Sequence, residues 1–381
     1  MVWTNLHAKV HRTIRSRLLF DRGQRLLIAV SGGQDSLCLM KLLLDLQPKW
    51  KWELGLAHCD HRWRDDSQAN AEHVKKIAEY WGVSFYLETA SKAVNSEAMA
   101  RDWRYQALSA IAQAHNYKYI VTGHTASDRA ETLLYNLMRG TGADGLQALT
   151  WQRPLTENIL LVRPLLEITR KQTEQFCQEF QLPIWEDSTN QDLKYARNRI
   201  RQELIPYLQG NFNPQAELAI AQTAELLQAE VEYLEQQAQQ LKEEAMEWGV
   251  GSGGSLRSRS VSETDAPRTT ALTNQEWGVG GDGEVGKDRK NKISPSSPSS
   301  PSSPSSPVRL NRRVLQKAPL ALQRRVMRQV LQGILPDAPN FEHIEKLTAL
   351  ITAPNRSQTD PFPGGAIAQV QDDWIILNTR D

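Results

Sequence analysis

The chain has 381 residues, enough for two or three domains of roughly 150 residues each, and 45 Lys and Arg against 44 Asp and Glu give a formal charge of +1. With this balance the chain as a whole has no strong positive potential that would attract a polyanion, so a nucleic-acid site has to be a local basic patch. Three scattered cysteines without a Cys-x-x-Cys pair argue against a disulfide framework, a zinc site or an iron–sulfur cluster of that spacing, and no apolar run approaches the roughly 18 residues of a membrane helix. We therefore expect a cytoplasmic protein without a membrane partner.

The N-terminal 20 residues carry four basic residues and no acidic one, which superficially suits a targeting segment (Lys9, Arg12, Arg15 and Arg17). However, Val10, Ile14 and Leu18 recur at helical spacing, and a buried-strand pattern begins soon afterwards at Leu26. We therefore expect a first helix of the folded protein here.

The next part of the chain alternates short apolar runs with stretches of helical periodicity. The runs that predict strands are residues 26–30, 54–57, 85–87 and 119–122, and helices are expected at 37–46 and 69–80 among others. Strand–helix alternation of this kind predicts an α/β domain whose parallel sheet is covered on both faces. Ligands of such sheets bind beyond the carboxyl ends of the strands, so the residues after each strand are the candidates for a site.

The composition changes twice further along the chain. Residues 216–248 predict a long, acidic helical linker, and residues 249–307, rich in Gly, Ser and Pro, predict a disordered insertion that buries no core. Residues 308–381 regain periodicity, with helices near 320–331 and 341–351 and a hairpin ending at 374–377. We therefore divide the chain into a catalytic domain at 1–215, the linker, the insertion and a small α+β C-terminal domain.

The strongest motif lies directly after the first strand and opens a helix: Ser31, Gly32, Gly33, Gln34, Asp35 and Ser36. Two glycines let the backbone approach a phosphate, and the helix offers free N–H groups at its N-terminus. Asp35 is out of place in an anion cradle unless a divalent cation mediates, which suggests Mg²⁺. The simpler alternative is a glycine-rich turn with Asp35 near the helix cap. The motif lacks the Gly-Lys-Ser/Thr of a Walker loop and the GxGxxG of dinucleotide folds.

The second strand ends in His58-Cys59-Asp60-His61, and the fourth in Gly123-His124-Thr125, followed by Ser127-Asp128 and Glu131-Thr132. Histidines and a carboxylate this close are compatible with a metal site, but a structural histidine is the commoner meaning. The segment after the fourth strand also reads as a helix N-terminus with Ser127 as the cap. Both segments are expected to face the same crevice as the glycine-rich motif.

Two segments are locally basic. Arg197, Arg199 and Arg201 follow Tyr195, and Arg324, Arg325 and Arg328 belong to a stretch from 308 to 336 that contains no acidic residue. Such runs often mark a solvated helix face, whereas arginine forks with an aromatic nearby suit RNA phosphates and base edges. The apolar spacing of Leu322, Val326 and Val330 leads us to expect Arg324, Arg325 and Arg328 on the outward face.

Taken together, these motifs resemble the tRNA(Ile)-lysidine synthetase family of the PP-loop ATP-pyrophosphatase superfamily. The resemblance covers about the first 210 residues and includes the three strand-end motifs, together with residues 139–146, 163–166 and 186–190 running into 197–201. The family usually has paired acids where Ser127-Asp128 stands, so Asp128 is expected to act alone. The insertion at 249–307 is not a family feature.

The resemblance implies a ligase that uses ATP and Mg²⁺, with ATP bound at residues 31–36 and the metal at Asp35 and Asp128. The substrates would be isoleucine tRNA with the anticodon CAU and free L-lysine, joined at C2 of the wobble cytidine through an adenylated intermediate. His124 would contact the phosphates or transfer a proton, Asp60 and Glu131 would bind the lysine ammonium, and the two arginine clusters would contact tRNA.

Three alternatives remain open at this point: a tRNA thiolation enzyme of the same superfamily, an ammonia-using amidoligase and a non-catalytic nucleotide-binding RNA-binding protein. The thiolation enzyme is less favoured, because some enzymes of that kind use paired cysteines and this chain lacks them. The amidoligase would leave both basic clusters unexplained. The sequence also leaves the oligomeric state open, a homodimer included.

Overall fold

The computed structural model describes residues 2–62, 66–91, 97–185, 192–247 and 307–378, which form two compact units divided within one long helix between Gln228 and Ala229. We describe each unit by itself. The expected disordered insertion at 249–307 and the Glu186–Asn190 motif lie almost entirely outside the described residues.

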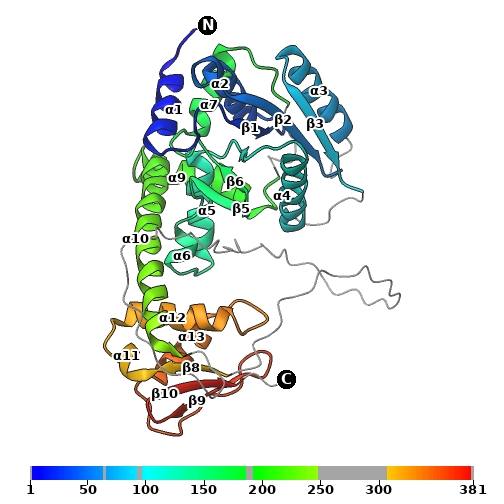
Figure 1. Cartoon of the computed structure of the whole chain (residues 1–381). Coiled ribbons are helices and arrows are strands. Elements are labelled where there is room, and N and C mark those ends of the chain that lie inside the picture. The colour runs from blue at the N-terminus through cyan, green and yellow to red at the C-terminus, as the bar shows by residue number, and fades with distance from the viewer. Residues whose placement is uncertain (1, 63–65, 92–96, 186–191, 248–306, 379–381) are drawn as a thin grey trace, which may run out of the picture. The chain divides into compact units, whose positions relative to one another are not determined.

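The first unit has a six-stranded sheet in the order β3-β2-β1-β4-β6-β5 (Figure 1). Its strands are β1 (Arg25–Ala29), β2 (Glu53–Asp60), β3 (Ser84–Thr89), β4 (Tyr119–Val121), β5 (Gln152–Thr156) and β6 (Ile159–Val162). Its helices are α1 (Asn5–Ser16), α2 (Gln34–Trp50), α3 (Ser67–Tyr80), α4 (Glu97–Ala114), α5 (Ala126–Met138), α6 (Ala143–Leu146), α7 (Arg170–Glu179), α8 (Ala196–Arg199) with the π-helical turn η2 (Ile200–Leu204), and α9 (Ile205–Asn211). The expected α/β fold, including the N-terminal helix, is thereby confirmed.

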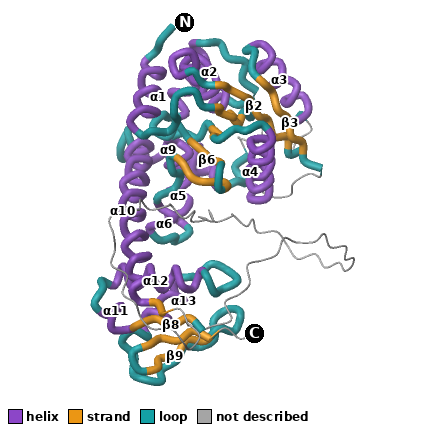
Figure 2. Tube along the Cα trace, viewed as in Figure 1, coloured by secondary structure: helices purple, strands orange, loops and turns teal. Residues whose placement is uncertain are grey.

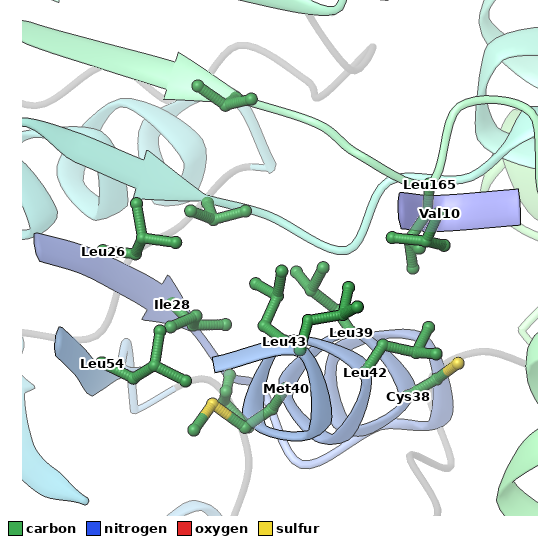
Figure 3. Packing of buried hydrophobic residues seen from close by; sticks show 14 of the residues in the cluster. Val10, Leu26, Ile28, Cys38, Leu39, Met40, Leu42, Leu43, Leu54 and Leu165 are labelled. Carbon is green, nitrogen blue, oxygen red and sulfur yellow. The ribbon is translucent and has the colours of Figure 1, made fainter. Parts of the chain in front are cut away.

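Side-chain alternation along β1 explains why this sheet is covered on both faces. Leu26 and Ile28 pack with α1, α2 and α7 in one buried cluster, whereas Leu27 packs with α4 in another. Figure 3 shows the first of these, where Leu43 of α2 lies beside Ile28, and Leu39 and Leu42 of the same helix belong to the same cluster. The first cluster holds α2 against β1, and the second covers the other face of the sheet with α4.

One part of the sheet differs from the expected parallel arrangement. The four strands predicted from apolar runs all pair in parallel, but β5 and β6 form an antiparallel hairpin at the edge, of which β6 continues the parallel part beside β4. The sequence of β5 is mostly polar and contains Pro154, which is tolerated only where a strand has a free edge. A strand of this composition leaves no apolar signal.

The long helix α10 (Ala216–Ala245) confirms the helix expected at 216–248, and its residues are divided between the two units. The second unit adds β7 (Met246–Glu247), β8 (Val308–Asn311), α11 (Arg312–Gln316), α12 (Leu320–Gln332), α13 (Phe341–Ala349), β9 (Ile367–Gln371) and β10 (Trp374–Asn378). Its antiparallel sheet has the order β7-β8-β10-β9. Figure 2 shows strands of this unit, among them β8 and β9, in orange and the helices α11, α12 and α13 in purple. The predicted helices and C-terminal hairpin are confirmed, while β7 and β8 were not foreseen.

Candidate functional site

The glycine-rich loop between β1 and α2 is shaped so that its backbone faces outward. Gly32 has a φ of +90°, and a Cβ atom there would lie 2.5 Å from Asn70 Oδ1, so only glycine fits. Ser31 N donates to Ser36 Oγ at 3.2 Å, and Ser36 Oγ donates to the Gly33 carbonyl at 2.9 Å. Gly33 is the N-cap of α2, and no described side chain caps that end. The first N–H groups of α2 are therefore available to an anion.

Two contacts that the sequence did not predict fix the shape of this loop. Asn70 of α3 donates from Nδ2 to the Ser31 carbonyl at 3.0 Å, and the Trp185 N–H donates to the Gly32 carbonyl at 3.0 Å. The close packing of β4 against the loop has the same effect, because a Cβ at Gly123 would lie 2.9 Å from the Asp35 backbone. The segments that follow β1 and β4 thus meet at this loop, which is where doubly wound sheets bind their ligands.

Asp128 lies in the first turn of α5 and belongs to its cap. Thr125, rather than Ser127, is the N-cap: Thr125 N and Oγ1 donate to Asp128 Oδ2 at 2.7 and 2.8 Å. Ser127 is buried, and its Oγ accepts a hydrogen bond from the Arg170 N–H at 2.9 Å. The serine in place of the usual acid therefore joins the start of α7 to the start of α5.

Arg170, which the sequence did not single out, links the two carboxylates expected to hold a metal. Its Nε and Nη2 lie 3.0 and 2.9 Å from Asp35 Oδ2, and the same Nη2 lies 3.5 Å from Asp128 Oδ1. Asp35 Oδ1 also accepts from Thr173 Oγ1, one turn further along α7. The sequence did contain a signal for a residue at this place. Thr169 is a capping residue that predicts a helix start, and Arg170 lies in the segment after β6, the strand that pairs with β4.

The charges of this cluster shift one another. Burial raises the pKa of Asp35, and the nearby Arg170 offsets only part of this. Burial also opposes ionisation of Asp128, but Arg170 and then His124 outweigh it, so its pKa is lowered. For Arg170 burial is outweighed by Asp128 and Asp35, so its pKa is raised. Arg170 therefore stays charged between the two carboxyl groups.

Glu131, one turn beyond Asp128, is paired with Arg201 rather than facing open space. Arg201 Nε lies 2.6 Å from Glu131 Oε1 and Nη2 lies 2.8 Å from Oε2, a bidentate pair, and Nη2 also lies 3.7 Å from Asp128. Burial raises the pKa of Glu131 more than Arg201 lowers it. The structure thus places Arg201 within the candidate site, whereas the sequence placed it on a basic surface with Arg197 and Arg199.

His124 follows β4 and lies beside Thr122, whose Oγ1 is 2.8 Å from His124 Nδ1. Burial, followed by the positive charge of Arg163, lowers the pKa of His124 to about 3. The imidazole is therefore neutral at physiological pH and acts as a hydrogen-bond partner rather than as a fixed cation.

At the end of β2, His58 has the structural role that was the commoner expectation. It is buried, and its Nδ1–H donates to the Val30 carbonyl at 2.7 Å. Asp60 is buried too and accepts from the Arg62 N–H at 2.8 Å. Since β1 lies between β2 and β4, Asp60 and Glu131 stand on opposite sides of the glycine-rich loop.

The carboxylates of Asp35 and Asp128 fit a magnesium site by their chemistry and placement. Both offer hard oxygen donors, and both lie within 3.5 Å of one nitrogen of Arg170, so a single cation already holds them together. Within the described residues no third His, Cys, Asp or Glu completes a metal-binding cluster with them. Mg²⁺ commonly binds through one or two carboxylates with substrate phosphates supplying further oxygens.

The second arginine cluster differs from the expected outward face. Arg325 and Arg328 both bind Glu235 of α10, and their side chains are only 12% and 18% exposed. Arg324 forms a bidentate pair with Glu345. The expectation that Arg325 and Arg328 point to solvent is wrong, because the second half of α10 packs on this unit and covers them, a contact between residues about 90 positions apart.

The loop after β1 and the sheet order define a PP-loop protein, the class that a family model described as the PP-loop domain matches at residues 4–208. A second model, described as the TilS substrate binding domain, matches residues 310–373. The chain is 78% identical over 381 residues to the tRNA(Ile)-lysidine synthase of Nostoc sp., covering 100% of this chain and 99% of that one. It is 45% identical to that of Synechocystis sp., with 98% of both chains covered. The chain therefore belongs to the tRNA(Ile)-lysidine synthase family and is an ATP-using enzyme, and the resemblance noted in the sequence is confirmed.

A solved structure supports the fold independently. The U34-tRNA thiolase NcsA of Methanococcus maripaludis, described with its [4Fe-4S] cluster, is 15% identical, has a TM-score of 0.50 and covers 58% of this chain and 77% of its own. At this identity the similarity concerns the fold alone. None of the helices in the described part of the chain has the length and apolarity that crossing a membrane requires.

Proposed function

We propose that the protein ligates L-lysine to C2 of the wobble cytidine in isoleucine tRNA with the anticodon CAU, which changes the codon read from AUG to AUA. The observation that carries the proposal is the cluster of Asp35, Asp128 and Glu131 at the PP-loop, in a chain of the tRNA(Ile)-lysidine synthase family. The reaction would take place in the cytoplasm, where tRNA is found. A homodimer stays a prediction.

In the first step the C2 carbonyl oxygen of the cytidine attacks the α-phosphate of ATP, and pyrophosphate leaves. The N–H groups of the first turn of α2 would hold the departing pyrophosphate, since they lie at the positive end of this helix. Asp35 and Asp128 would hold Mg²⁺, which when bound offsets negative charge on the phosphates. Neutral His124 would donate a hydrogen bond to a phosphate from Nε2–H when the Thr122 hydroxyl occupies Nδ1.

In the second step the ε-amino group of lysine attacks C2 and AMP leaves. The amine has to lose a proton first, and Glu131, whose pKa burial raises, is suited to hold the ammonium group and to accept that proton. The lysine ammonium would then compete with Arg201 for the Glu131 carboxylate. Asp60, on the other side of the loop, is the second candidate for binding lysine.

Contacts to the tRNA would come from basic residues of both units. Arg199 is exposed, with Tyr195 close to it in sequence and 39% exposed, and arginine and tyrosine suit phosphate oxygens and unstacked bases. Arg197 and Arg201 of the same segment, and Arg324, Arg325 and Arg328 of the C-terminal unit, remain candidates. Arg325 and Arg328 would contact the tRNA only after their ion pairs with Glu235 break.

A release assay tests the proposal against its rivals. Pyrophosphate and AMP are measured after adding ATP and Mg²⁺ with tRNA alone, with lysine alone and with both. We expect AMP release only when both substrates are present. AMP release that needs a sulfur donor instead of lysine would identify a thiolation enzyme, and release without RNA would identify an amidoligase.

A further inference from the structure

Hydrogen bonds to its backbone hold Arg170 at its position between Asp35 and Asp128. Its backbone N–H donates to Ser127 Oγ, and its carbonyl accepts from Gln34 Nε2 at 3.0 Å and Thr173 Oγ1 at 2.8 Å. The backbone of this residue is therefore fixed at both ends, by the PP-loop and by α5. Its side chain is 31% exposed and so has room to leave the carboxylates without entering the core.

The guanidinium and a divalent cation would compete for the same atoms. Arg170 Nη2 lies 2.9 Å from Asp35 Oδ2 and 3.5 Å from Asp128 Oδ1, and a cation held by both carboxylates would use oxygens that the guanidinium already contacts. Mg²⁺ binds carboxylate oxygens at about 2.0–2.1 Å. Two cations at these two oxygens would repel each other in a partly buried site, so the arginine has to move when the metal binds.

We propose that Arg170 is an internal counter-ion that takes the place of Mg²⁺ between Asp35 and Asp128 in the ligand-free enzyme and moves to the polyphosphate when Mg²⁺–ATP binds. This inference rests on the proposed magnesium site. The exchange keeps both carboxylates neutralised in each state, and it gives the displaced guanidinium an anion with which it forms strong, forked hydrogen bonds. Without ATP the displaced arginine has no comparable partner, so divalent-cation binding depends on the nucleotide.

The test measures metal binding without nucleotide and without turnover. Mn²⁺ is titrated into wild-type protein and into Arg170→Gln, and the free ion is followed by electron paramagnetic resonance. Removing a competing charge from a partly buried pair leads us to expect Mn²⁺ binding tighter by about tenfold or more in Arg170→Gln. The same variant should bind ATP in the absence of metal about tenfold more weakly, because one phosphate partner is gone.

Two further variants show which atoms are responsible. Lys171→Gln removes an exposed positive charge from the next position of the same helix and should bind Mn²⁺ as the wild type does. Adding Asp128→Asn to Arg170→Gln should abolish the gain, while the amide oxygen can still accept the hydrogen bond from Thr125 N. Arg170→Lys retains a cation but not the fork, and should show an intermediate affinity.

Unchanged Mn²⁺ affinity in folded Arg170→Gln would overturn the inference, and so would an equal gain in Lys171→Gln. If Arg170→Gln does not fold, unchanged Mn²⁺ affinity in Arg170→Lys overturns it. The proposed function fails separately, namely if the wild type releases no AMP with tRNA and lysine.

Discussion

Substituting Gly32 with alanine tests how the PP-loop is held in place. The φ of +90° places a side chain in a region that non-glycine residues avoid, and the new Cβ would lie 2.5 Å from Asn70 Oδ1. The backbone strain costs about 1–2 kcal/mol, and displacing Asn70 from the Ser31 carbonyl costs about 1 kcal/mol more. We therefore expect the catalytic unit to lose about 2–3 kcal/mol, a fall in its melting temperature of roughly 5–10 °C.

The matched control is Gly33→Ala, one residue further. Gly33 has an ordinary φ of −75°, and its Cβ would lie 3.5 Å from Ser31 Oγ, a normal contact. Thermal unfolding followed by circular dichroism compares the two variants, and ATP binding is measured below both transitions. Gly32→Ala should melt well below Gly33→Ala and bind ATP more weakly. Equal melting temperatures for the two variants would refute the reasoning.

Three other predictions follow from the structure. Asp35→Ala should abolish pyrophosphate release while tRNA binding in a filter assay is retained, because Asp35 belongs to neither arginine cluster; near-normal release would exclude Asp35 from the metal site. Replacing residues 249–306 with a turn of about eight residues should leave activity intact and stabilise the C-terminal unit by about 1–2 kcal/mol, because β7 and β8 pair antiparallel and a shorter loop closes at lower entropic cost; loss of active protein would contradict this. Folding lowers the pKa of His124 from about 6.5 to about 3, so below pH 6.5 this histidine is protonated in the unfolded chain but not in the folded one. The contribution of neutral His124 to stability is therefore fully present above pH 6.5 and is lost as the pH falls. His124→Asn should therefore flatten the fall in stability between pH 7 and 5; parallel curves for wild type and His124→Asn would disprove this assignment.

The sequence predicted the parts of the molecule that depend on local patterns. The strand–glycine–helix sequence at 31–36 requires an open helix N-terminus, and the carboxyl ends of parallel strands necessarily meet at one edge, so the PP-loop, Asp60 and His124 were assigned to one crevice. The apolar periodicity also predicted the N-terminal helix, the helices near 37–46, 69–80, 216–248, 320–331 and 341–351, and the C-terminal hairpin.

The features that the sequence did not predict are ion pairs between residues far apart in the chain. Arg170 reaches Asp35 across 135 positions, and no local pattern signals that pairing. Arg325 and Arg328 look like a basic surface in sequence, yet Glu235 neutralises them because α10 packs on their helix. Charged residues indicate that a partner is needed but not which one, so the ion pairs of the site were the least predictable part.

Incorporation of lysine into RNA is the most direct test of the central claim. The protein is incubated with ATP, Mg²⁺, radiolabelled L-lysine and a transcript of isoleucine tRNA with the anticodon CAU, and label is counted in the RNA. The account predicts label only when ATP is present and none when the wobble C is replaced by U. Absence of label from the CAU transcript, with ATP still cleaved to AMP when another amine or a sulfur donor is supplied, would contradict it.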